Sequence, residues 1–193
     1  SSLHQLAFSV CGFSRYTMQA VGGSTFWSLE ENGPLLITHW GLSGPAILKI
    51  SAWKARELFD LKYQFEIEVN FIAKTIYEAE ALFMEFRQNN PKKTIGQSKI
   101  FDVTNRFWNK LLEISGVNPE KNISNISSKE LQKILENLCQ KKFRVDGKST
   151  FKDEFVTAGG VDLKEINFKN MSSKILENLY LAGEVLNVDA VTG

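Results

Sequence analysis

The spacing of apolar residues changes twice along the chain. Residues 63–71 alternate strictly between apolar and polar side chains, which is the period of a strand with one wet face. From about residue 75 to 142, apolar positions recur every three or four residues, as they do in amphipathic helices. Strand character returns with Phe143 and Val145. The order β-rich, helical, β-rich predicts an α+β body that carries an inserted helical lobe.

The first forty-five residues predict strands, two turns and the start of a helix. Residues 6–29 read as strands, with Gly22-Gly23 as a hairpin turn. Residues 31–34 (Glu-Asn-Gly-Pro) predict a second turn, and the apolar run 35–38 predicts a strand buried on both faces. The triplet 43–45 (Ser-Gly-Pro) predicts a helix start, with the serine as cap and the proline in the first turn.

Three helices are predicted in the central part of the chain. The first begins at Thr75 and ends before Pro91. The second carries the apolar residues between 101 and 112. The third begins with a capping box, in which Ser127 and Glu130 bond each other's backbone amides.

Composition and charge narrow the functional classes. Hydrophobic residues make up 43% of the 193 residues, so the chain is expected to fold around a core. The net charge of +1 gives no reason to expect nucleic acid as a partner. No signal peptide or membrane-length apolar run occurs, and Cys11 and Cys139 match no metal spacing. We expect a cytoplasmic protein with reduced thiols, no metal site and no membrane contact.

The two ends of the chain predict a piece of a longer protein. The sequence begins at Ser1 without a methionine and stops at Gly193, directly after an apolar segment. Natural termini tend to be polar and frayed.

A serine hydrolase is one alternative that the residues suggest. The run 41–45 (Gly-Leu-Ser-Gly-Pro) partly matches the nucleophile elbow of α/β-hydrolases, and His39 lies two residues upstream. The elbow requires glycine at its fifth position, where this chain has Pro45. The favoured interpretation is therefore Ser43 as a helix cap and His39 as a packed residue.

Two glycine segments near the end of the chain have features of a cofactor site. Gly159-Gly160 follows a run of strand character, and Gly183-Glu184 follows the apolar run 179–182, which predicts a short strand. Ligands of open α/β sheets bind at the carboxyl ends of strands, and glycine lets the backbone approach a cofactor closely. For either segment alone, a plain strand followed by a turn is the favoured interpretation.

Four segments, taken in order, resemble a known family of FAD-binding flavoproteins. These proteins are known as NAD(FAD)-utilizing dehydrogenases or NAD(P)/FAD-dependent oxidoreductases, with aminoacetone-oxidase-like enzymes among them. They carry T-H-x-G-L-S-G-P, then T-A-G-G-V, then M-x-S-K, and finally G-E-V-L-D-V-D-G-x-T-G-G-Y-N. The matching segments here are Thr38 to Pro45, Thr157 to Val161, Met171 with Ser173 and Lys174, and Gly183 to Gly193.

The resemblance implies a Rossmann-type FAD domain built from both ends of a longer chain, with a β-barrel-like domain and a helical lobe inserted in its middle. This chain would hold the β part of the insert in residues 1–73 and 143–165, and its helical subdomain in residues 74–142. Residues 166–193 would be a partial FAD-binding domain. The partner of that part would be the missing N-terminal Rossmann portion of the same protein.

The resemblance also implies which residues bind FAD. Gly183-Glu184 is similar to the Gly-Asp step of related flavoproteins, whose acid contacts the ribityl chain. Gly159 and Gly160 would approach the isoalloxazine ring.

Three further residues, Asp189, Thr192 and Gly193, would line the phosphate and flavin side of the same site. The chain departs from the family at Asn187, where aspartate is usual, and at Ala190, where glycine is usual. No Gly-x-Gly-x-x-Gly occurs, so the cradle for the pyrophosphate is missing. We therefore expect that the chain alone does not bind FAD tightly.

Two main hypotheses follow. In the first, the whole protein is an FAD-dependent oxidoreductase that uses NAD(P)H and an unknown small molecule, its catalytic residues are unassigned, and this piece alone is inactive. In the second, the chain is a stand-alone binding module whose helical aromatic residues dock a protein or ligand. Core packing is the favoured role of those aromatic residues, which are Tyr77, Phe83, Phe86, Phe101, Phe107 and Trp108.

Overall fold

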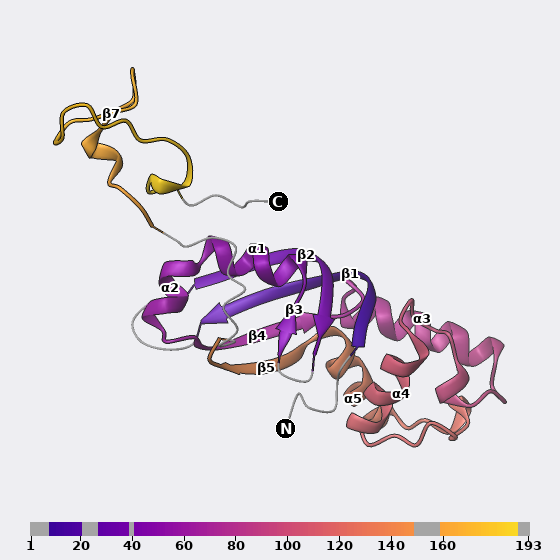
Figure 1. Cartoon of the computed structure of the whole chain (residues 1–193). Helices are drawn as coiled ribbons and strands as arrows, with labels where there is room; N and C mark the ends of the chain where they lie inside the picture. The colour runs from indigo at the N-terminus through magenta and orange to yellow at the C-terminus, as the bar shows by residue number, and fades with distance from the viewer. Residues whose placement is uncertain (1–7, 21–26, 39–40, 149–158, 189–193) are drawn as a thin grey trace.

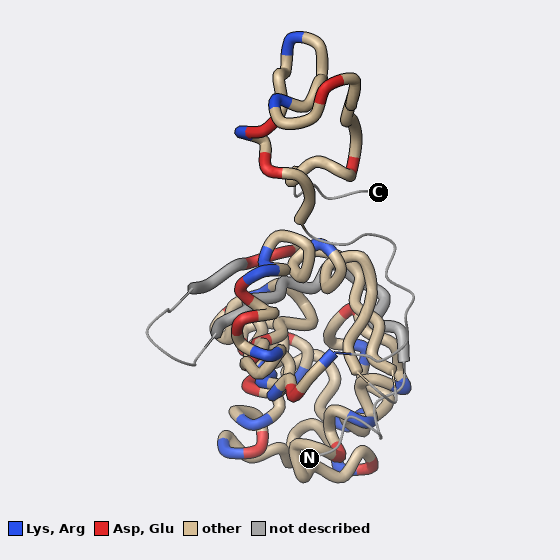
Figure 2. The backbone as a smooth tube through the Cα atoms, turned by 60° about the vertical axis from the view of Figure 1, so that its left-hand side comes forward, with Lys and Arg blue, Asp and Glu red and all other residues tan. Residues whose placement is uncertain are grey.

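An antiparallel sheet, a lobe of three helices and a C-terminal segment make up the part of the chain that is described (Figure 1). The computed structural model describes residues 8–20, 27–38, 41–148 and 159–188. Most of residues 159–188 lie away from the sheet and the helices in both Figure 1 and Figure 2. Among the described helices, none has the length and apolar character needed to cross a membrane.

The sheet contains five strands in the order β3-β2-β1-β4-β5, and all neighbours are antiparallel. The strands are β1 (Phe8–Ala20), β2 (Trp27–Ile37), β3 (Leu42–Ser43), β4 (Gln64–Asn70) and β5 (Lys141–Asp146). In β4 the buried residues alternate with more exposed ones, which confirms the predicted strand. Mixed helices and antiparallel strands also confirm the α+β class. The described strands form an open sheet and no closed barrel, so the barrel-like expectation is not met in this part of the chain.

The turn predicted at residues 31–34 is wrong, because β2 runs straight through it. Val10 pairs with Leu35 and Ser14 pairs with Gly33, so three residues of β1 lie opposite the single Pro34. Such a bulge leaves positions without ladder hydrogen bonds, and a proline fits there because it has no amide hydrogen to pair. Pairing with the bulged strand β1 therefore keeps β2 continuous, and the residues around Pro34 alone do not reveal that pairing.

The next segment is buried on one face only, whereas burial on both faces was predicted. Leu35 and Ile37 are each 1% exposed, but Leu36 between them is 41% exposed. Helix α1 (Pro45–Trp53) packs against β2 on the buried side. The sheet is covered here by one layer, so its side chains alternate.

Gly44, and not Ser43, caps helix α1. Ser43 pairs with Leu36 in the ladder between β2 and β3, and α1 has no side-chain cap. Gly44 has a φ of +106°, and a Cβ atom there would lie 2.8 Å from the carbonyl oxygen of Pro34. Pro45 occupies the first helical turn as predicted.

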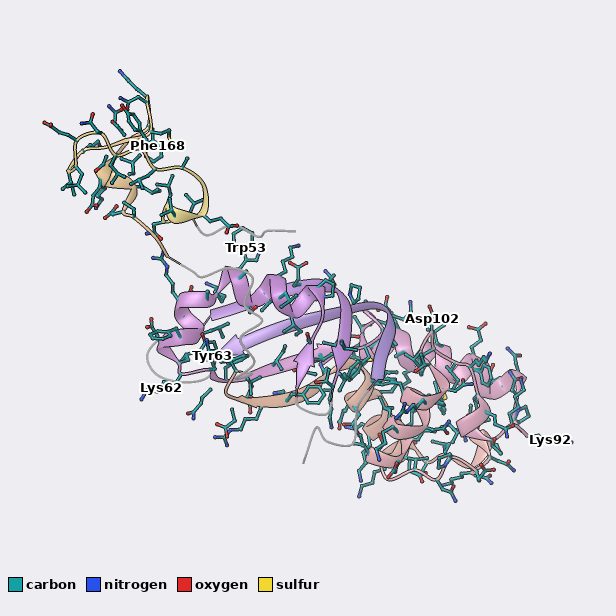
Figure 3. All side chains as sticks on the ribbon, in the orientation of Figure 1. Trp53, Lys62, Tyr63, Lys92, Asp102 and Phe168 are labelled. Atoms are coloured by element: carbon teal, nitrogen blue, oxygen red, sulfur yellow. The ribbon has the colours of Figure 1, made fainter. Side chains whose placement is uncertain are left out.

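Three large apolar side chains lie on the outer surface of α1 and of the short helix α2 (Ala55–Asp60), beside charged ones. Leu48, Trp53 and Phe59 are between 56% and 71% exposed, and Figure 3 shows Trp53 pointing away from the sheet. Isolated apolar side chains on a surface are ordinary.

The helical lobe contains α3 (Ile76–Asn89), α4 (Asn105–Ile114) and α5 (Ser128–Cys139). The capping box predicted for Ser127 and Glu130 begins α5 and is confirmed. Helix α3 begins after Thr75 as predicted, and Thr75 forms a second capping box with Glu78. Helix α4 starts later than the apolar pattern suggested. Thr104 caps it by accepting a hydrogen bond from the amide of Phe107.

Two short 3-10 turns, η2 (Ile95–Gln97) and η3 (Ile123–Asn125), pair with each other inside the lobe. The amide of Ile95 donates to the carbonyl of Lys121, and the amide of Ile123 donates to the carbonyl of Lys93, both at 2.9 Å. The sequence pattern Asn-Pro-x-Lys-x-Ile precedes each turn, at residues 90–95 and 118–123. The lobe is thus built on a repeated turn with two-fold hydrogen bonding.

Aromatic side chains join the lobe to the sheet and fill its core. The rings of Phe71, after β4, and Phe107 lie 4.7 Å apart. Phe83 and Trp108 are at most 3% exposed, and the Trp108 indole donates to the carbonyl of Ile95 at 2.7 Å. Tyr77 is 84% exposed. Core packing therefore accounts for most of the aromatic residues on which the binding-module hypothesis rested.

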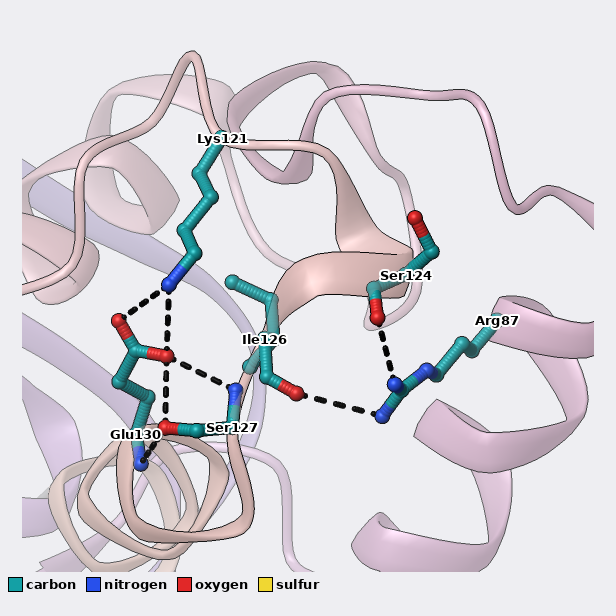
Figure 4. A network of polar contacts seen from close by, with 6 residues as sticks. All are labelled: Arg87, Lys121, Ser124, Ile126, Ser127 and Glu130. Atoms are coloured by element: carbon teal, nitrogen blue, oxygen red, sulfur yellow. Dashed lines mark hydrogen bonds and ion pairs between the residues drawn. The ribbon is translucent and has the colours of Figure 1, made fainter.

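Polar contacts close the lobe around the start of α5 (Figure 4). The Lys121 ammonium lies 2.8 and 2.9 Å from the two carboxylate oxygens of Glu130. The Arg87 guanidinium donates to the carbonyls of Ser124 and Ile126 at 2.6 and 3.3 Å. Because Arg87 of α3 holds the carbonyls of Ser124 and Ile126, and Lys121 holds Glu130 of α5, the turn η3 is fixed between α3 and α5. The predicted domain boundaries at residues 73, 142 and 165 stay predictions.

Candidate functional site

The two glycine segments that the sequence singled out lie side by side in the structure. The amide of Val161 donates to the carbonyl of Val185 at 2.9 Å, and the amide of Asn187 donates to the carbonyl of Val161 at 3.0 Å. Val161 and Leu186 form a parallel bridge. Residues 159–161 and 183–187 therefore form one cluster, although they are distant in sequence.

Gly160 is required at this contact. A Cβ atom at this position would lie 2.5 Å from the carbonyl carbon of Leu186 and 2.6 Å from the carbonyl oxygen of Val185, closer than real Cβ atoms approach. Gly159 and Gly183 have φ of +102° and +77°, a backbone conformation that favours glycine. A close backbone contact at Gly160 and a positive φ at Gly159 and Gly183 therefore favour glycine at these three positions.

Glu184 lies in the 3-10 turn η5 (Gly183–Val185) and is exposed, so solvent reaches its side chain. The structure brings Gly159, Gly160, Gly183 and Glu184 into one cluster. Asp189, Thr192 and Gly193 lie outside the described residues, and so does His39 of the hydrolase hypothesis. The assignment of all seven residues to FAD stays a prediction.

The third family-like segment, Met171 with Ser173 and Lys174, forms a hairpin. Strand β7 (Ser172–Ser173) pairs with β6 (Ile166–Asn167), and the amide of Lys174 donates to the carbonyl of Glu165 at 2.8 Å. Met171 has a φ of +60°. This segment is therefore a turn that places its neighbours, and none of its described contacts is to the glycine cluster.

The strand predicted at residues 179–182 is wrong. Only an isolated bridge between Tyr180 and Ser172 forms there, and Tyr180 is 65% exposed. A strand of a parallel sheet is stabilised by strands beside it and helices over its faces. Among the described residues only the two-residue strand β7 lies beside this run, through the amides of Ser173 and Leu181, which bond the carbonyls of Leu179 and Met171 at 2.8 and 2.9 Å. The large side chains Leu179 and Tyr180 of this run therefore stay exposed.

The whole C-terminal segment lacks a core of its own. Within residues 159–188 only Ile166 and Leu186 are buried among the large apolar residues. The exposed ones are 38% to 66% accessible, namely Phe168, Ile175, Leu176, Leu179, Tyr180, Val185 and Val188; Figure 3 marks Phe168. A segment this short cannot bury enough surface to be stable alone, and contiguous apolar patches mark contact surfaces.

One contact that the sequence did not predict reaches the glycine cluster from α2. The Arg56 guanidinium donates to the side-chain oxygen of Asn187. Asn187 is the position where the resembling family usually has aspartate. Arg56 and Asn187 lie far apart in sequence, so only covariation of these two positions would have revealed their contact.

The other reactive groups among the described residues do not form a catalytic centre. Burial raises the pKa of the Cys139 thiol to about 11, and the nearby Glu78 carboxylate acts in the same direction. A thiol held in its protonated form is a poor nucleophile. No group of three or more possible metal ligands occurs in the described part of the chain. Ser43 lies in the β2–β3 ladder.

Comparison with known proteins gives one family and several relatives. The family model described as "HI0933-like protein barrel and H2TH domain" matches residues 4–156. Ribosomal RNA dihydrouridine synthases of Haemophilus influenzae and Escherichia coli are 29% and 26% identical over 92% and 90% of this chain. The 3-dehydro-bile acid delta(4,6)-reductase of Clostridium scindens is 26% identical over 85% of it. This chain spans 40% of the length of each of these relatives.

Proposed function

The chain belongs to the family of HI0933-like proteins, within the FAD-dependent oxidoreductase superfamily, and from this membership we propose that it is part of an FAD-dependent reductase. Bound FAD, reduced by NAD(P)H, would supply the hydride, while the protein supplies binding, orientation and electrostatics. A cytoplasmic location, where thiols such as Cys139 stay reduced, is part of the proposal.

The cluster of the two glycine segments is the observation that carries this proposal. Gly159, Gly160 and Gly183 offer backbone without side chains, which is what a flat ring system needs for a close approach. The exposed Glu184 would accept hydrogen bonds from the ribityl hydroxyls. In the proposal, the phosphate and flavin side is completed by Asp189, Thr192 and Gly193.

The proposal also assigns a partner to the uncovered apolar face of residues 159–188. The relatives are more than twice as long as this chain, which spans 40% of their length. We propose that an N-terminal Rossmann portion of the same protein packs on Phe168, Ile175 and Leu176. That portion would bring the Gly-x-Gly-x-x-Gly cradle that this chain lacks.

The relatives suggest a class of substrate. Dihydrouridine is uridine with two hydrogens added across a C=C bond that is conjugated to a carbonyl. A 3-dehydro steroid with double bonds at positions 4 and 6 has the same arrangement. We therefore propose that the substrate carries a C=C bond conjugated to a carbonyl, which takes up one hydride and one proton.

The full-length protein with Glu184→Gln tests the flavin role. Loss of a charged acceptor costs about 1.5–3 kcal/mol, or more than a tenfold loss of FAD affinity. Glu177→Gln is the matched control, because Glu177 is exposed on the same segment outside the cluster. Equal FAD affinities of the two variants would refute the assignment of Glu184, and a natively purified full-length protein that takes up no FAD would refute the proposal itself.

A further inference from the structure

Helix α1 is apolar on both of its sides. Its residues, Pro45–Trp53, include only two polar ones, Lys49 and Ser51. The inner side of the helix packs against β2, whereas Leu48 and Trp53 are 59% and 56% exposed. A surface helix normally has one apolar stripe opposite a polar face, and a helix that is apolar all round is normally covered on both sides. The outer side of α1 therefore has the composition of a covered surface.

Both polar side chains of α1 are engaged within this chain. The Lys49 ammonium lies 2.9 Å from the carboxylate of Glu31 in β2. The Ser51 hydroxyl donates to the carbonyl of Leu48 at 2.9 Å. Polar groups that already have partners lose less free energy on leaving water than unpaired ones. The cost of covering the outer side of α1 is therefore reduced.

Helix α2 continues this surface with Phe59, which is 71% exposed. Among the charged residues beside it, Lys54 and Glu57 form an ion pair at 2.7 Å. Asp60 is exposed at the end of the helix. The remaining charge of α2 is Arg56, whose partner lies in the C-terminal segment.

Arg56 joins this surface to the glycine cluster. Its guanidinium donates to the side-chain oxygen of Asn187, whose own amide donates to the carbonyl of Val161 at 3.0 Å. Val185 and Val188, on either side of Asn187 in sequence, are 48% and 54% exposed. Arginine is enriched in protein interfaces, where apolar side chains surround its hydrogen bonds. Two uncovered apolar surfaces thus meet at one charged hydrogen bond.

We propose that α1 and α2 form a docking surface for the N-terminal Rossmann portion of the same protein, with the hydrogen bond between Arg56 and Asn187 as its fixed point. The inference rests on the proposed function, which assigns residues 166–193 to the Rossmann-type domain. Because Asn187 is part of that assignment and contacts α2, the domain that it helps to complete has to lie beside α2. In Figure 1, α1 and α2 lie on the side of the sheet toward residues 159–188.

A portion of the same protein suits this surface better than a separate molecule does. The relatives are more than twice as long as this chain. A domain tethered by its own chain is present at an effective concentration on the order of millimolar. A few apolar side chains and one hydrogen bond are then enough to hold it, whereas a stable complex of separate proteins needs a larger interface.

Photo-cross-linking within the full-length protein tests the docking surface. The photoreactive residue p-benzoylphenylalanine is placed at Trp53 or at Phe59, and the cross-linked peptides are identified by mass spectrometry after irradiation. The control carries the same residue at Tyr77, which is 84% exposed on α3 of the helical lobe. We expect positions 53 and 59 to cross-link to peptides that precede this chain in the same molecule, and position 77 to give no such product.

Cross-links that join two molecules, seen as a covalent dimer on a denaturing gel, would overturn the proposal and indicate a second copy as the partner. Absence of cross-links from positions 53 and 59, or equal cross-linking from position 77, would also overturn it. The FAD content of the same preparations is measured separately. A protein that holds FAD without these cross-links would refute the docking surface alone, whereas cross-links in a protein that takes up no FAD would refute the proposed function alone.

Hydrogen exchange of residues 183–187 in the full-length protein tests the role of Arg56. After correction for intrinsic rates, Arg56→Gln should speed exchange about tenfold, because a hydrogen bond from a charged group is lost. Lys62→Gln removes the same charge from an exposed residue just after α2 and should change exchange less than about twofold. Asn187→Asp should slow exchange, because a carboxylate accepts from arginine more strongly than an amide does. Equal effects of Arg56→Gln and Lys62→Gln, or faster exchange in Asn187→Asp, would overturn the assignment of Arg56 as the fixed point.

Discussion

The carboxylate of Glu130 offers the sharpest test of how the helical lobe is held together. It accepts hydrogen bonds from the Lys121 ammonium at 2.8 and 2.9 Å, and from the amide and hydroxyl of Ser127 at 2.8 and 2.7 Å (Figure 4). The Lys121 hydrogen bond, followed by those of Ser127, lowers the pKa of Glu130 from 4.5 to about 2. One side chain thus caps α5 and joins it to the loop before η3.

The sign and size of the effect follow from the pKa. The folded-state pKa is below the unfolded one, so the ionised carboxylate stabilises the fold above pH 4.5, and this stability is lost as the pH falls toward 2. The full shift would correspond to about 3 kcal/mol. The Glu130 side chain is 26% exposed and that of Lys121 33%, so solvent screening reduces the expected effect to about 1–2 kcal/mol.

Urea denaturation of the 193-residue chain and of Glu130→Gln at pH 7 and pH 2.5 measures this contribution. We expect Glu130→Gln to lower the free energy of unfolding by about 1–2 kcal/mol at pH 7 and by much less at pH 2.5. Glu120→Gln, in the same loop but fully outside the capping box, is the control and changes little at either pH. Equal losses at both pH values, or none at pH 7, would refute the reasoning.

Three further predictions concern backbone geometry and burial. Gly160→Ala should speed amide hydrogen exchange at Asn187, because the added Cβ collides with the backbone of Leu186 and costs about 1–3 kcal/mol; unchanged exchange would contradict the close contact. Lys62→Gly should raise Tm by a few degrees, because Lys62 is exposed at a φ of +53° and glycine removes about 0.5–1 kcal/mol of strain; a lower Tm in a thermal scan would count against it. The buried thiol of Cys139, with its pKa raised to about 11, should be alkylated far more slowly at pH 8 in the folded chain than in urea, as judged by peptide mass spectrometry; equal rates would show that the thiol is accessible.

Elements stabilised by contacts between residues close in sequence could be predicted, because the sequence shows both partners of each contact together. The capping boxes at Thr75 and Ser127 involve residues three positions apart, and the alternation in β4 reflects one buried face. The repeated turn at residues 90–95 and 118–123 was also visible in the sequence, as two copies of Asn-Pro-x-Lys-x-Ile. A search for internal repeats would have found it.

The predictions were wrong where pairing with a strand elsewhere in the sequence determines the local structure. Pro34 predicts a turn on local grounds, but a bulge in β1 accommodates it within β2. Ser43 is a good cap by type, yet its backbone is engaged by β2. Residues 179–182 have the composition of a strand, but among the described residues their strand neighbour is β7, which is only two residues long. In each case the deciding partner is remote in sequence.

The candidate site also has one part that the local sequence indicated and one part that depends on contacts between distant residues. The sequence singled out the glycines at residues 159, 160 and 183 for the approach of a cofactor, which stays a prediction, and the structure adds a backbone reason for glycine at each position. That residues 159–161 pair with 183–187 follows from hydrogen bonds across more than twenty residues, which spacing alone does not reveal. The contact of Arg56 with Asn187 is equally non-local.

Flavin titration is the most direct test of the central claim, that residues 157–193 are one half of an FAD site. Fluorescence quenching would compare this 193-residue chain with a version of the protein extended at both ends. We predict tight FAD binding by the extended protein and weak or no binding by the chain alone, because in this account the pyrophosphate cradle would lie outside the chain. No binding by either would contradict the claim, and the glycine cluster would then be a structural turn.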